Sequence, residues 1–444
     1  MLTLFKKGRF LFRLTTAFFR THKKTIIWAG FVGAFITVIS PNLVNLFLKR
    51  KPVKIGLVGK YTLADLPDEV IKYLSQGLTT INNDGSVSPA LASSWDISQD
   101  GKIYRFSLRS GLVWHDGTPV TAADINYNFS DVAVKKIDDQ TVEFELKEFF
   151  SPFPSVVSRP LLKKVIIGFG DYRVKSVKRN GQIVENLLLT PLDASKKKLF
   201  FKFYPSETMA ETAFKLGEID IIKDLSFPDE FSNWPNIKIE SKVKNDQFTA
   251  IIFNTQNSLL SQKPIRQALA YMLKKNWPNR AYGPINPQSW AYNPNLKRYE
   301  YDLPKARELL EKNSSEDNQA GKKIVLTTFP SLFSIAEAIT GDWQELGFET
   351  EIQVTNSVPD TFQAFLVTED IPPDPDQYLL WHSTQPNNLS RYHSPQIDKL
   401  LEEGRKTFDQ DKRRELYLDF QRFLVEDAST IFLYHPTVYT VNRE

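Results

Sequence analysis

The chain has 444 residues, of which 41% are hydrophobic and 13% aromatic, so it is long enough and apolar enough for two or three domains with cores of their own. It contains no cysteine. This excludes disulfides, thiolate metal sites, thiol nucleophiles and the lipidated cysteine of a bacterial lipoprotein.

The formal net charge of +4 hides an asymmetry along the chain. Residues 1–54 contain eleven Lys or Arg and no acid, which leaves 45 basic and 52 acidic residues, a net charge of −7, for the remainder. The basic charge therefore belongs to the N-terminal segment, and the body is mildly acidic. A basic pI of this origin does not indicate nucleic-acid binding, and we expect no nucleic-acid partner.

The N-terminal segment predicts a membrane anchor. Residues 25–48, TIIWAGFVGAFITVISPNLVNLFL, are 24 uncharged residues, enough for a helix to cross a hydrocarbon layer of about 30 Å. Seven basic residues precede this stretch and four follow it. They predict that residues 1–24 are cytoplasmic and that the body lies outside the cell membrane. A cleaved signal peptide is the alternative, although the apolar stretch is long and no A-x-A-like site follows it.

The body begins with a strand predicted at 54–61 and a helix at 66–76. An alternating strand at 102–109 follows an Asp-Gly turn. Thr121 and Asp124 have the spacing of a capping box, so a helix is predicted to start there.

A helix ending at Gly217 is predicted next. Met209, Ala213 and Leu216 are spaced to form its apolar face, and Gly217 supplies the left-handed position beyond the last turn. A strand at 248–254 then enters a new region.

The second half of the body alternates helices and strands. Pro264 is predicted in the first turn of a helix with an apolar face, and Asp302–Pro304 begins another. Further elements are expected at 334–346, 349–355, 395–407, 410–426 and 431–441, the last as a single strand. This alternation indicates an α/β protein with two lobes.

The stretch 370–393, DIPPDPDQYLLWHSTQPNNLSRYH, is the first candidate for a binding site. It has no sustained period of 3.6 or 2 residues, so it is predicted to be an ordered, loop-rich connection. Long irregular segments in compact domains are usually functional or disordered, and its aromatic residues argue against disorder.

Residues 77–129, from GLTTINNDG to INYNF, resemble a known family. They contain the GL pair, the run P-x-L-A-x-S-W, a strand ending in L-R, and W-x-D-G-x-P with a following A-x-D. Together these resemble the N-terminal block of bacterial extracytoplasmic solute-binding proteins of the peptide/nickel type (family 5), the receptors of oligopeptide and dipeptide ABC importers. Five further blocks continue the resemblance in order, at 137–146, 209–222, 251–275, 290–313 and 374–405.

The resemblance implies a two-lobed periplasmic-binding-protein-like fold of type II, in the peptide-binder class, with hinge strands and an N-terminal transmembrane helix before it. Lobe one would be residues 51–250 completed by 431–444, and lobe two 251–430. The ligand would bind in the cleft between the lobes. Two departures are expected: a longer family insertion is missing between Phe129 and Val132, which trims the subdomain of lobe one, and the chain stops at Glu444, where relatives generally continue.

Asp374 and Asp376 are the first choices for ligand contact. A carboxylate on a cleft wall can accept charge-assisted hydrogen bonds from a peptide ammonium, the role of an acid from this region in peptide-binding relatives. Helix capping by the Asp-Pro-Asp sequence is the alternative. Six other candidates are aromatic or polar side chains: Trp381, His382, Trp290, Tyr292, Asn388 and Tyr392. Packing or a structural hydrogen bond is the alternative for His382, Trp290 and Tyr292.

Neither metal binding nor catalysis is predicted. The histidines form no HExxH and no close pair: His22, His115, His382, His393 and His435. A nickel ion carried as a chelate stays open. No G-x-S-x-G or credible Ser-His-Asp arrangement is present, and the acids at 374 and 376 lack an evident partner across a cleft. We expect no cofactor and no enzymatic activity.

The sequence therefore predicts a membrane-anchored, extracytoplasmic receptor, monomeric, that captures a peptide or similar polar solute and delivers it to the permease of an ABC transporter. Binding would stabilise the closed form of the two lobes. The alternative is a degenerate binding lobe that acts as a structural or signalling module at the membrane.

Overall fold

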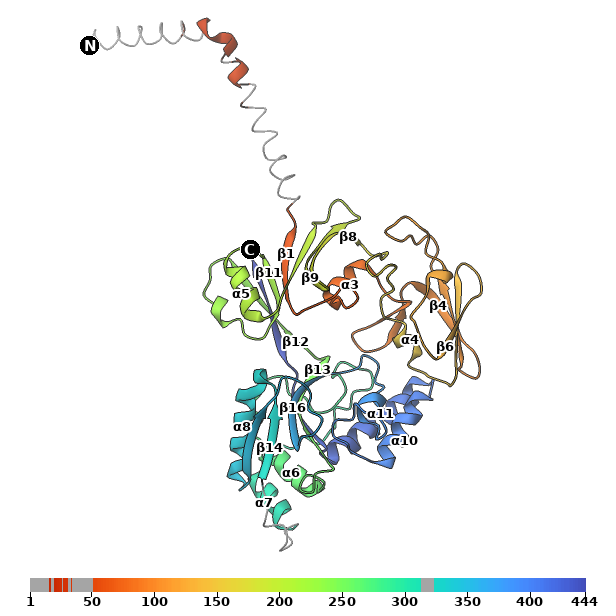
Figure 1. The fold of residues 1–444 in the computed structure, drawn as a ribbon, viewed down its shortest axis with the longest axis vertical. Helices are drawn as coiled ribbons and strands as arrows, with labels where there is room; N and C mark the ends of the chain where they lie inside the picture. Colours follow the sequence, from red (N-terminus) through yellow and green to blue (C-terminus); the bar gives the residue numbers. More distant parts are fainter. Residues whose placement is uncertain (1–15, 17–19, 26, 31–32, 34–50, 313–322) are drawn as a thin grey trace, which may run out of the picture.

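The computed structural model describes residues 16, 20–25, 27–30, 33, 51–312 and 323–444. Within these ranges the chain forms two lobes, each built on its own sheet (Figure 1). No helix among the described residues is both long and apolar enough to cross a membrane. The predicted span 25–48 lies largely outside the described residues.

The first lobe is built on a seven-stranded mixed sheet with the order β12-β18-β11-β1-β10-β9-β8. Its strands are β1 (Val53–Val58), β8 (Tyr172–Asn180), β9 (Ile183–Pro191), β10 (Leu199–Tyr204), β11 (Ile221–Leu225), β12 (Ile237–Val243) and β18 (Thr437–Arg443). The central strand β1 runs parallel to β10 and β11, and helices α3 (Asp68–Leu74) and α5 (Glu207–Lys215) contact this sheet. Since the middle of β1 is buried between these layers, its residues are apolar without alternation.

A small subdomain, residues 77–161, extends from the first lobe and has a core of its own. Its antiparallel sheet contains β4 (Ala92–Ile97), β5 (Ile103–Leu108), β7 (Thr141–Leu146) and β6 (Val132–Lys136), in that order. The hairpin β2 (Thr79–Ile81) and β3 (Val87–Pro89), the 3-10 turn Ala122–Asp124 and the short helix α4 (Phe153–Val156) complete it. The capping box of Thr121 and Asp124 is confirmed, although the turn that it begins is only three residues long.

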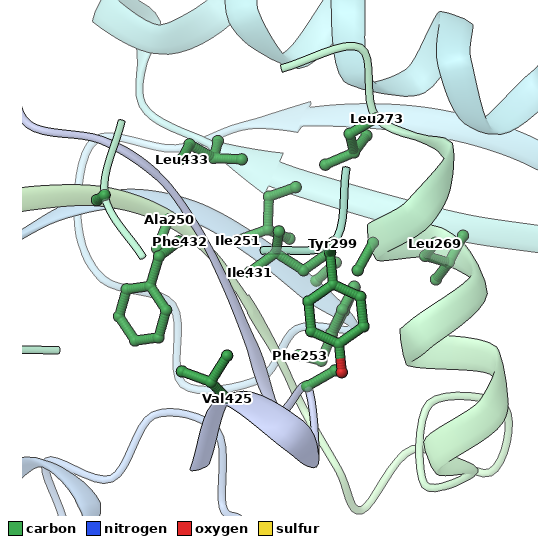
Figure 2. Packing of buried hydrophobic residues seen from close by; sticks show 14 of the residues in the cluster. Ala250, Ile251, Phe253, Leu269, Leu273, Tyr299, Val425, Ile431, Phe432 and Leu433 are labelled. Carbon is green, nitrogen blue, oxygen red and sulfur yellow. The ribbon is translucent and has the colours of Figure 1, made fainter. Parts of the chain in front are cut away.

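The second lobe is built on a five-stranded sheet with the order β15-β14-β16-β13-β17. Its strands are β13 (Gln247–Phe253), β14 (Lys323–Thr328), β15 (Glu349–Val354), β16 (Ala364–Asp370) and β17 (Thr430–Tyr434). Its helices are α6 (Lys263–Met272), α7 (Leu303–Glu311), α8 (Phe333–Glu345), α9 (Tyr378–Trp381), α10 (Pro395–Arg405) and α11 (Gln410–Glu426). Figure 2 shows side chains of β13 and β17 packed together with Leu269 and Leu273 from the α6 region.

Helix starts and apolar faces in this lobe follow the sequence closely. Pro264 lies in the first turn of α6, whose Ile265, Leu269 and Met272 are buried. Asp302 caps α7, accepting a hydrogen bond from the backbone N–H of Lys305 at 2.9 Å. Stable caps and apolar stripes are local features, so they could be predicted before the tertiary fold was known.

Two predictions about elements were wrong. The apolar face of α5 is Ala210, Ala213 and Phe214, while Met209 and Leu216 are 52% and 72% exposed. The last segment, 431–441, is not a single strand, because it divides into β17 in one sheet and β18 in the other. The ring of Pro436, which removes a backbone donor, lies at this division.

The chain passes between the lobes twice, at adjacent places. The first passage, residues 244–246, joins β12 to β13, and the second, residues 435–436, joins β17 to β18. The sheets place β13 and β17 wholly in the second lobe, so the passages lie a few residues from the expected boundaries at 250 and 431. The first passage is a turn, closed by a bond from the backbone N–H of Gln247 to the Lys244 carbonyl, and the second has no regular structure. Two adjacent passages of this kind are the arrangement of a hinge.

Candidate functional site

A cleft of about 1310 Å³ lies between the lobes. The first lobe supplies residues around the start of α3 and the turn 126–131 of the subdomain, while the second supplies residues 372–379 and Arg405. The charged side chains on its walls are Asp65, Asp68, Asp131, Arg159, Asp374, Asp376 and Arg405. A cleft of this size, walled by both lobes, can enclose a solute of several residues.

Asp374 lines the cleft but its carboxylate already has a buried partner. Its Oδ1 accepts a hydrogen bond from the guanidinium of Arg413 at 2.7 Å, and both side chains are about one-tenth exposed. The same oxygen accepts a bond from the backbone N–H of Asp376 at 2.9 Å. This carboxylate therefore stabilises the turn before α9 whether or not it also contacts a solute.

Asp376 also lines the cleft and is paired with Arg405. The Arg405 Nε lies 2.9 Å and 3.1 Å from the two carboxylate oxygens, and the backbone N–H of Tyr378 donates to Oδ1 at 3.2 Å. Burial raises the pKa of Asp376, and the charge of Arg405 opposes this rise. The bond from Tyr378 closes a turn just before α9, whose own cap residue, Gln377, makes no side-chain cap bond.

Trp381 and His382 are buried in the second lobe behind this turn. The Trp381 indole donates to the Gln377 side chain at 3.2 Å. The His382 ring stacks on Tyr378 at 4.1 Å, and its Nε2 lies 3.2 Å from a carboxylate oxygen of Glu402. These contacts hold the wall of the cleft in place from behind.

Trp290 and Tyr292 lie at the edge of the second lobe. The backbone N–H of Trp290 donates to the carbonyl of Asp84 in the subdomain at 2.9 Å, which joins the two lobes. The ring of Trp290 lies 5.4 Å from the guanidinium of Arg413. Tyr292 is half-buried against the core of the lobe, and burial raises its pKa.

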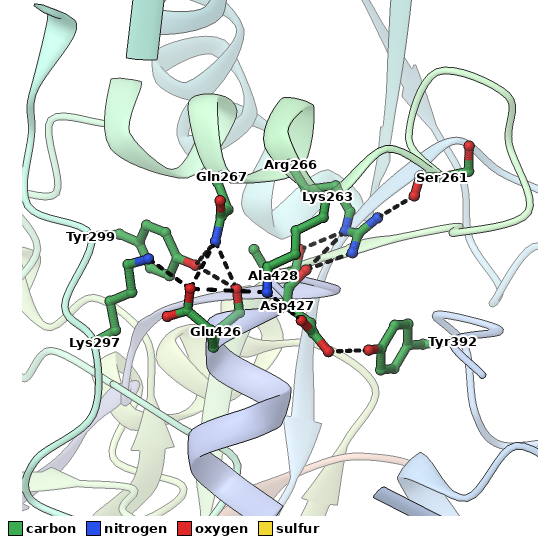
Figure 3. A network of polar contacts seen from close by, with 10 residues as sticks. All are labelled: Ser261, Lys263, Arg266, Gln267, Lys297, Tyr299, Tyr392, Glu426, Asp427 and Ala428. Atoms are coloured by element: carbon green, nitrogen blue, oxygen red, sulfur yellow. Dashed lines mark hydrogen bonds and ion pairs between the residues drawn. The ribbon is translucent and has the colours of Figure 1, made fainter. Parts of the chain in front are cut away.

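Asn388 and Tyr392 belong to the interior of the second lobe. The Asn388 amide donates to the carbonyl of Tyr392 at 2.9 Å. The Tyr392 hydroxyl donates to the Asp427 carboxylate, at one end of a polar network around the C-terminus of α11 (Figure 3). There Arg266 donates to the carbonyls of Asp427 and Ala428, which the helix end leaves without partners in the helix.

Of the eight candidates, the described lining of the cleft contains Asp374 and Asp376 but not the other six. Ligand contact by any of the eight stays a prediction. The six instead contact the core, the polar network or the subdomain. Their residue types are equally suited to packing, and a sequence without spatial neighbours does not distinguish the two uses.

Sequence reasoning missed the cationic side chains of the cleft. Arg405 stacks 3.9 Å above Tyr378 as well as pairing with Asp376, and Arg159 lies 5.9 Å from the rings of both Tyr127 and Phe129. Arg159 forms no ion pair with a described acid. Its neighbours in sequence, SRPLLKK, gave no motif that would have singled it out.

The lobes touch a second time, away from the hinge. In this subdomain contact, Ser151 donates from its backbone N–H to Arg405 at 2.8 Å and from its hydroxyl to Gly404 at 3.2 Å, at the end of α10. The ring of Phe149 lies 4.2 Å from that of Phe408. Gly85, beside the bond from Trp290 to Asp84, lies so close that an added Cβ would meet the Pro373 carbonyl at 2.9 Å.

The described residues contain no group of three or more His, Asp or Glu side chains placed to hold a metal ion. His382 has carboxylates near it, but it is 4% exposed and stacked on Tyr378. Its surroundings are those of a satisfied structural side chain.

The fold and the cleft agree with a comparison against protein families. A sequence model described as bacterial extracellular solute-binding proteins, family 5 Middle, matches residues 86–390. The chain belongs to this family. The match confirms the resemblance drawn from residues 77–129 and the later blocks, and it makes this solute-binding protein a member of a family of binding proteins, not of enzymes.

Individual relatives resemble this solute-binding protein over most of their length. Di/tripeptide-binding protein 1 of Pseudomonas aeruginosa is 24% identical over 476 aligned positions, covering 87% of each chain. The solved structure of CtaP, an ABC transporter substrate-binding protein of Listeria monocytogenes, has a TM-score of 0.77 at 23% identity, covering 89% of this chain and 94% of that one. NikZ of Campylobacter jejuni, solved in complex with Ni(L-His), has a TM-score of 0.74 at 24% identity, covering 88% and 94%. These structures confirm the two-lobed α/β fold.

Proposed function

We propose that this solute-binding protein captures a short peptide in the interlobe cleft and delivers it to the permease of an ABC importer. The observation that carries the proposal is the distribution of unpaired charge on the first-lobe wall. Among the described residues Arg159 has no acidic partner, and Asp65, Asp68 and Asp131 have no basic partner. A zwitterionic peptide can supply a carboxylate to the first and an ammonium to the acids.

The second-lobe wall supports the same solute. Asp376 and Arg405 face the cleft as a pair, so they offer both a hydrogen-bond acceptor and a donor without a net charge. Burying a free charge in a closed cleft is costly unless it is paired. A solute with two opposite charges therefore fits this cleft better than a simple anion or cation. The relatives named for di- and tripeptides bind solutes of this type.

The binding test uses calorimetry on the full chain with di-, tri- and tetrapeptides and with the same peptides amidated at the C-terminus. Free peptides should bind, and Arg159→Gln should weaken them by about 10- to 100-fold, since a hydrogen bond to a charged group contributes about 1.5–3 kcal/mol. Amidated peptides should be weak binders of both proteins. Arg173→Gln, an exposed position on β8, is the matched control and should change nothing.

Two results would contradict the proposal. If no peptide gives a heat of binding, a peptide is not the solute. If Arg159→Gln lowers the affinities for free and amidated peptides equally, Arg159 does not contact the peptide carboxylate. A screen of Ni(L-His) and other polar solutes on the same instrument covers the remaining solute classes. The open volume of the cleft favours solute capture over the alternative of a degenerate structural module.

We also propose that residues 25–48 anchor the protein in the cell membrane with its body outside. The support is the uncharged stretch and the basic residues that precede it. Washing membranes with high salt and no detergent should leave full-length protein in the pellet. Release of full-length protein into the wash would contradict the anchor, and a shortened mature chain would indicate a cleaved signal peptide.

A further inference from the structure

A second cavity, of about 610 Å³, lies between the subdomain and helices α9 and α10. Five aromatic side chains line it: Phe129, Phe149, Phe150, Phe153 and Tyr378. Charged side chains also line it, among them Asp131, Glu402 and Lys406. This cavity is called the side pocket below. Its size is that of a site for a small molecule or for one bulky side chain with room to spare.

The side pocket is continuous with the interlobe cleft. Phe129, Asp131, Phe150, Val156 and Arg405 line both cavities. A solute held in the cleft can therefore extend a group past these five residues without leaving the protein.

Fixed aromatic and guanidinium groups form the neck between the two cavities. The guanidinium of Arg405 lies 3.9 Å from the ring of Tyr378 and 5.2 Å from that of Phe150. The bonds from Arg405 to Asp376 and the stacking of His382 behind Tyr378 fix these groups in position. Aromatic faces and an immobilised guanidinium stack on planar groups, and such contacts add to the burial of apolar area.

A short connection in the subdomain leaves the side pocket accessible. Residues 125–131 lead directly from the 3-10 turn at Ala122–Asp124 into β6. Phe129 and Asp131 of this path, and Val132 at the start of β6, lie on the cavity wall. No further chain follows here to cover the aromatic side chains. Phe129, Phe149, Phe150 and Tyr378 are accordingly only half-buried.

We propose that the side pocket receives an aromatic side chain of the bound peptide, so that the preferred solute is a peptide containing Phe, Tyr or Trp. This inference rests on the proposed function, because it assumes that the cleft holds a peptide. It adds a selectivity that the charges of the cleft do not provide, since those charges bind only the two termini and any zwitterionic peptide has them.

Calorimetry with matched peptide sets tests the inference. Tripeptides that differ only by Phe, Leu or Ala at one position, scanned through the three positions, are titrated into the full chain. At one position Phe should bind about 10- to 100-fold more tightly than Ala, as expected for burying an aromatic side chain. Leu should fall between them.

A filled pocket provides the second measurement. Val132→Phe on β6 places a ring in the side pocket and should reduce the preference for Phe over Ala by about tenfold. Val134→Phe is the matched control, since Val134 follows two residues later on the same strand face, is 40% exposed and does not line the pocket. It should retain the wild-type preference.

The outcomes separate this inference from the proposed function. Tight binding of peptides with equal affinities for Phe and Ala at all positions would overturn the side pocket and leave peptide capture standing. A preference that survives in Val132→Phe as fully as in Val134→Phe would also overturn it. Failure of every peptide to bind would overturn both.

Discussion

The two places where the lobes touch are built differently. At the hinge, the backbone N–H of Lys244 donates to the carbonyl of Pro436 at 2.7 Å, and that of His435 donates to Asn279 at 2.7 Å. Strand pairing continues on both sides, between β12 and β18 in one lobe and between β13 and β17 in the other. At the subdomain contact, by comparison, a few bonds and one ring pair join elements that no shared strand supports.

This difference indicates which of the two contacts between the lobes separates when the cleft opens. At the hinge two covalent passages join the lobes, and strand pairing inside each lobe fixes both ends of these passages. At the subdomain contact the lobes are joined only by isolated bonds that water can replace. We therefore expect the lobes to separate at the subdomain contact and to rotate relative to each other about the hinge. The solute would stabilise the closed form because it contacts both walls.

The largest effect is expected from Arg413→Gln, which removes the support behind the subdomain contact. Arg413 donates to Asp374 at 2.7 Å and to the carbonyl of Gly404 at 3.1 Å. Breaking one partner of a buried ion pair leaves an uncompensated charge, so the free energy of unfolding should fall by about 3–5 kcal/mol. Urea denaturation measures this quantity.

Arg422→Gln is the control for that variant, since Arg422 pairs with Asp419 on the exposed face of the same helix. Its free energy of unfolding should change by less than about 1 kcal/mol. Equal effects of the two variants would show that the Arg413 pair is not a structural support.

A smaller effect is expected from Gly85→Ala, which should wedge the subdomain contact apart. Gly85 has φ +78°, and an added Cβ would lie 2.9 Å from the carbonyl of Pro373. With solute present, X-ray scattering should show a larger radius of gyration for Gly85→Ala than for the wild type. Calorimetry should show that the variant binds the solute more weakly.

Gly181→Ala separates the two causes of that effect. Gly181 has φ +59° but no atom within 4 Å of an added Cβ, so this variant carries the backbone strain without the clash. It should be destabilised by roughly 1 kcal/mol with unchanged solute affinity. Loss of affinity in both variants alike would argue against the wedge.

The smallest effect concerns pH at the hinge. His435 is buried, with Nδ1 2.7 Å from the Gln247 carbonyl, and burial lowers its pKa from the ordinary value of about 6.5. Below pH 6.5 the unfolded chain binds more protons at this residue than the folded chain does, so the free energy of unfolding should fall as the pH is lowered.

Denaturation at a series of pH values should show a flatter profile for His435→Gln than for the wild type. His393→Gln is the control, because the His393 side chain is 71% exposed, and its profile should follow the wild type. A His435→Gln profile parallel to the wild type below pH 6.5 would exclude the hinge histidine as the source.

Much of the fold could be predicted because its signals are local. The helix α11 was predicted with its bounds at 410–426, and the cap of α7 at Asp302 follows from the side chain and the proline beside it. The prediction of the apolar face of α5 was wrong because Met209 and Leu216 have suitable spacing, but the face that packs lies one residue further round the helix. Apolar spacing gives a period, while the neighbouring strands select which side of the helix is buried.

The sequence by itself determined the family and the two-lobed α/β class, since both rest on the order of residue types along the chain, and it predicted a binding role for residues 370–393. Only the tertiary structure decided which of those residues reach the cleft. It placed Asp374 and Asp376 on the wall, six other candidates behind it or beside it, and Arg159 and Arg405 from distant segments opposite and next to the acids. A binding site is a set of distances between such segments, and those distances are set by the packing of both lobes.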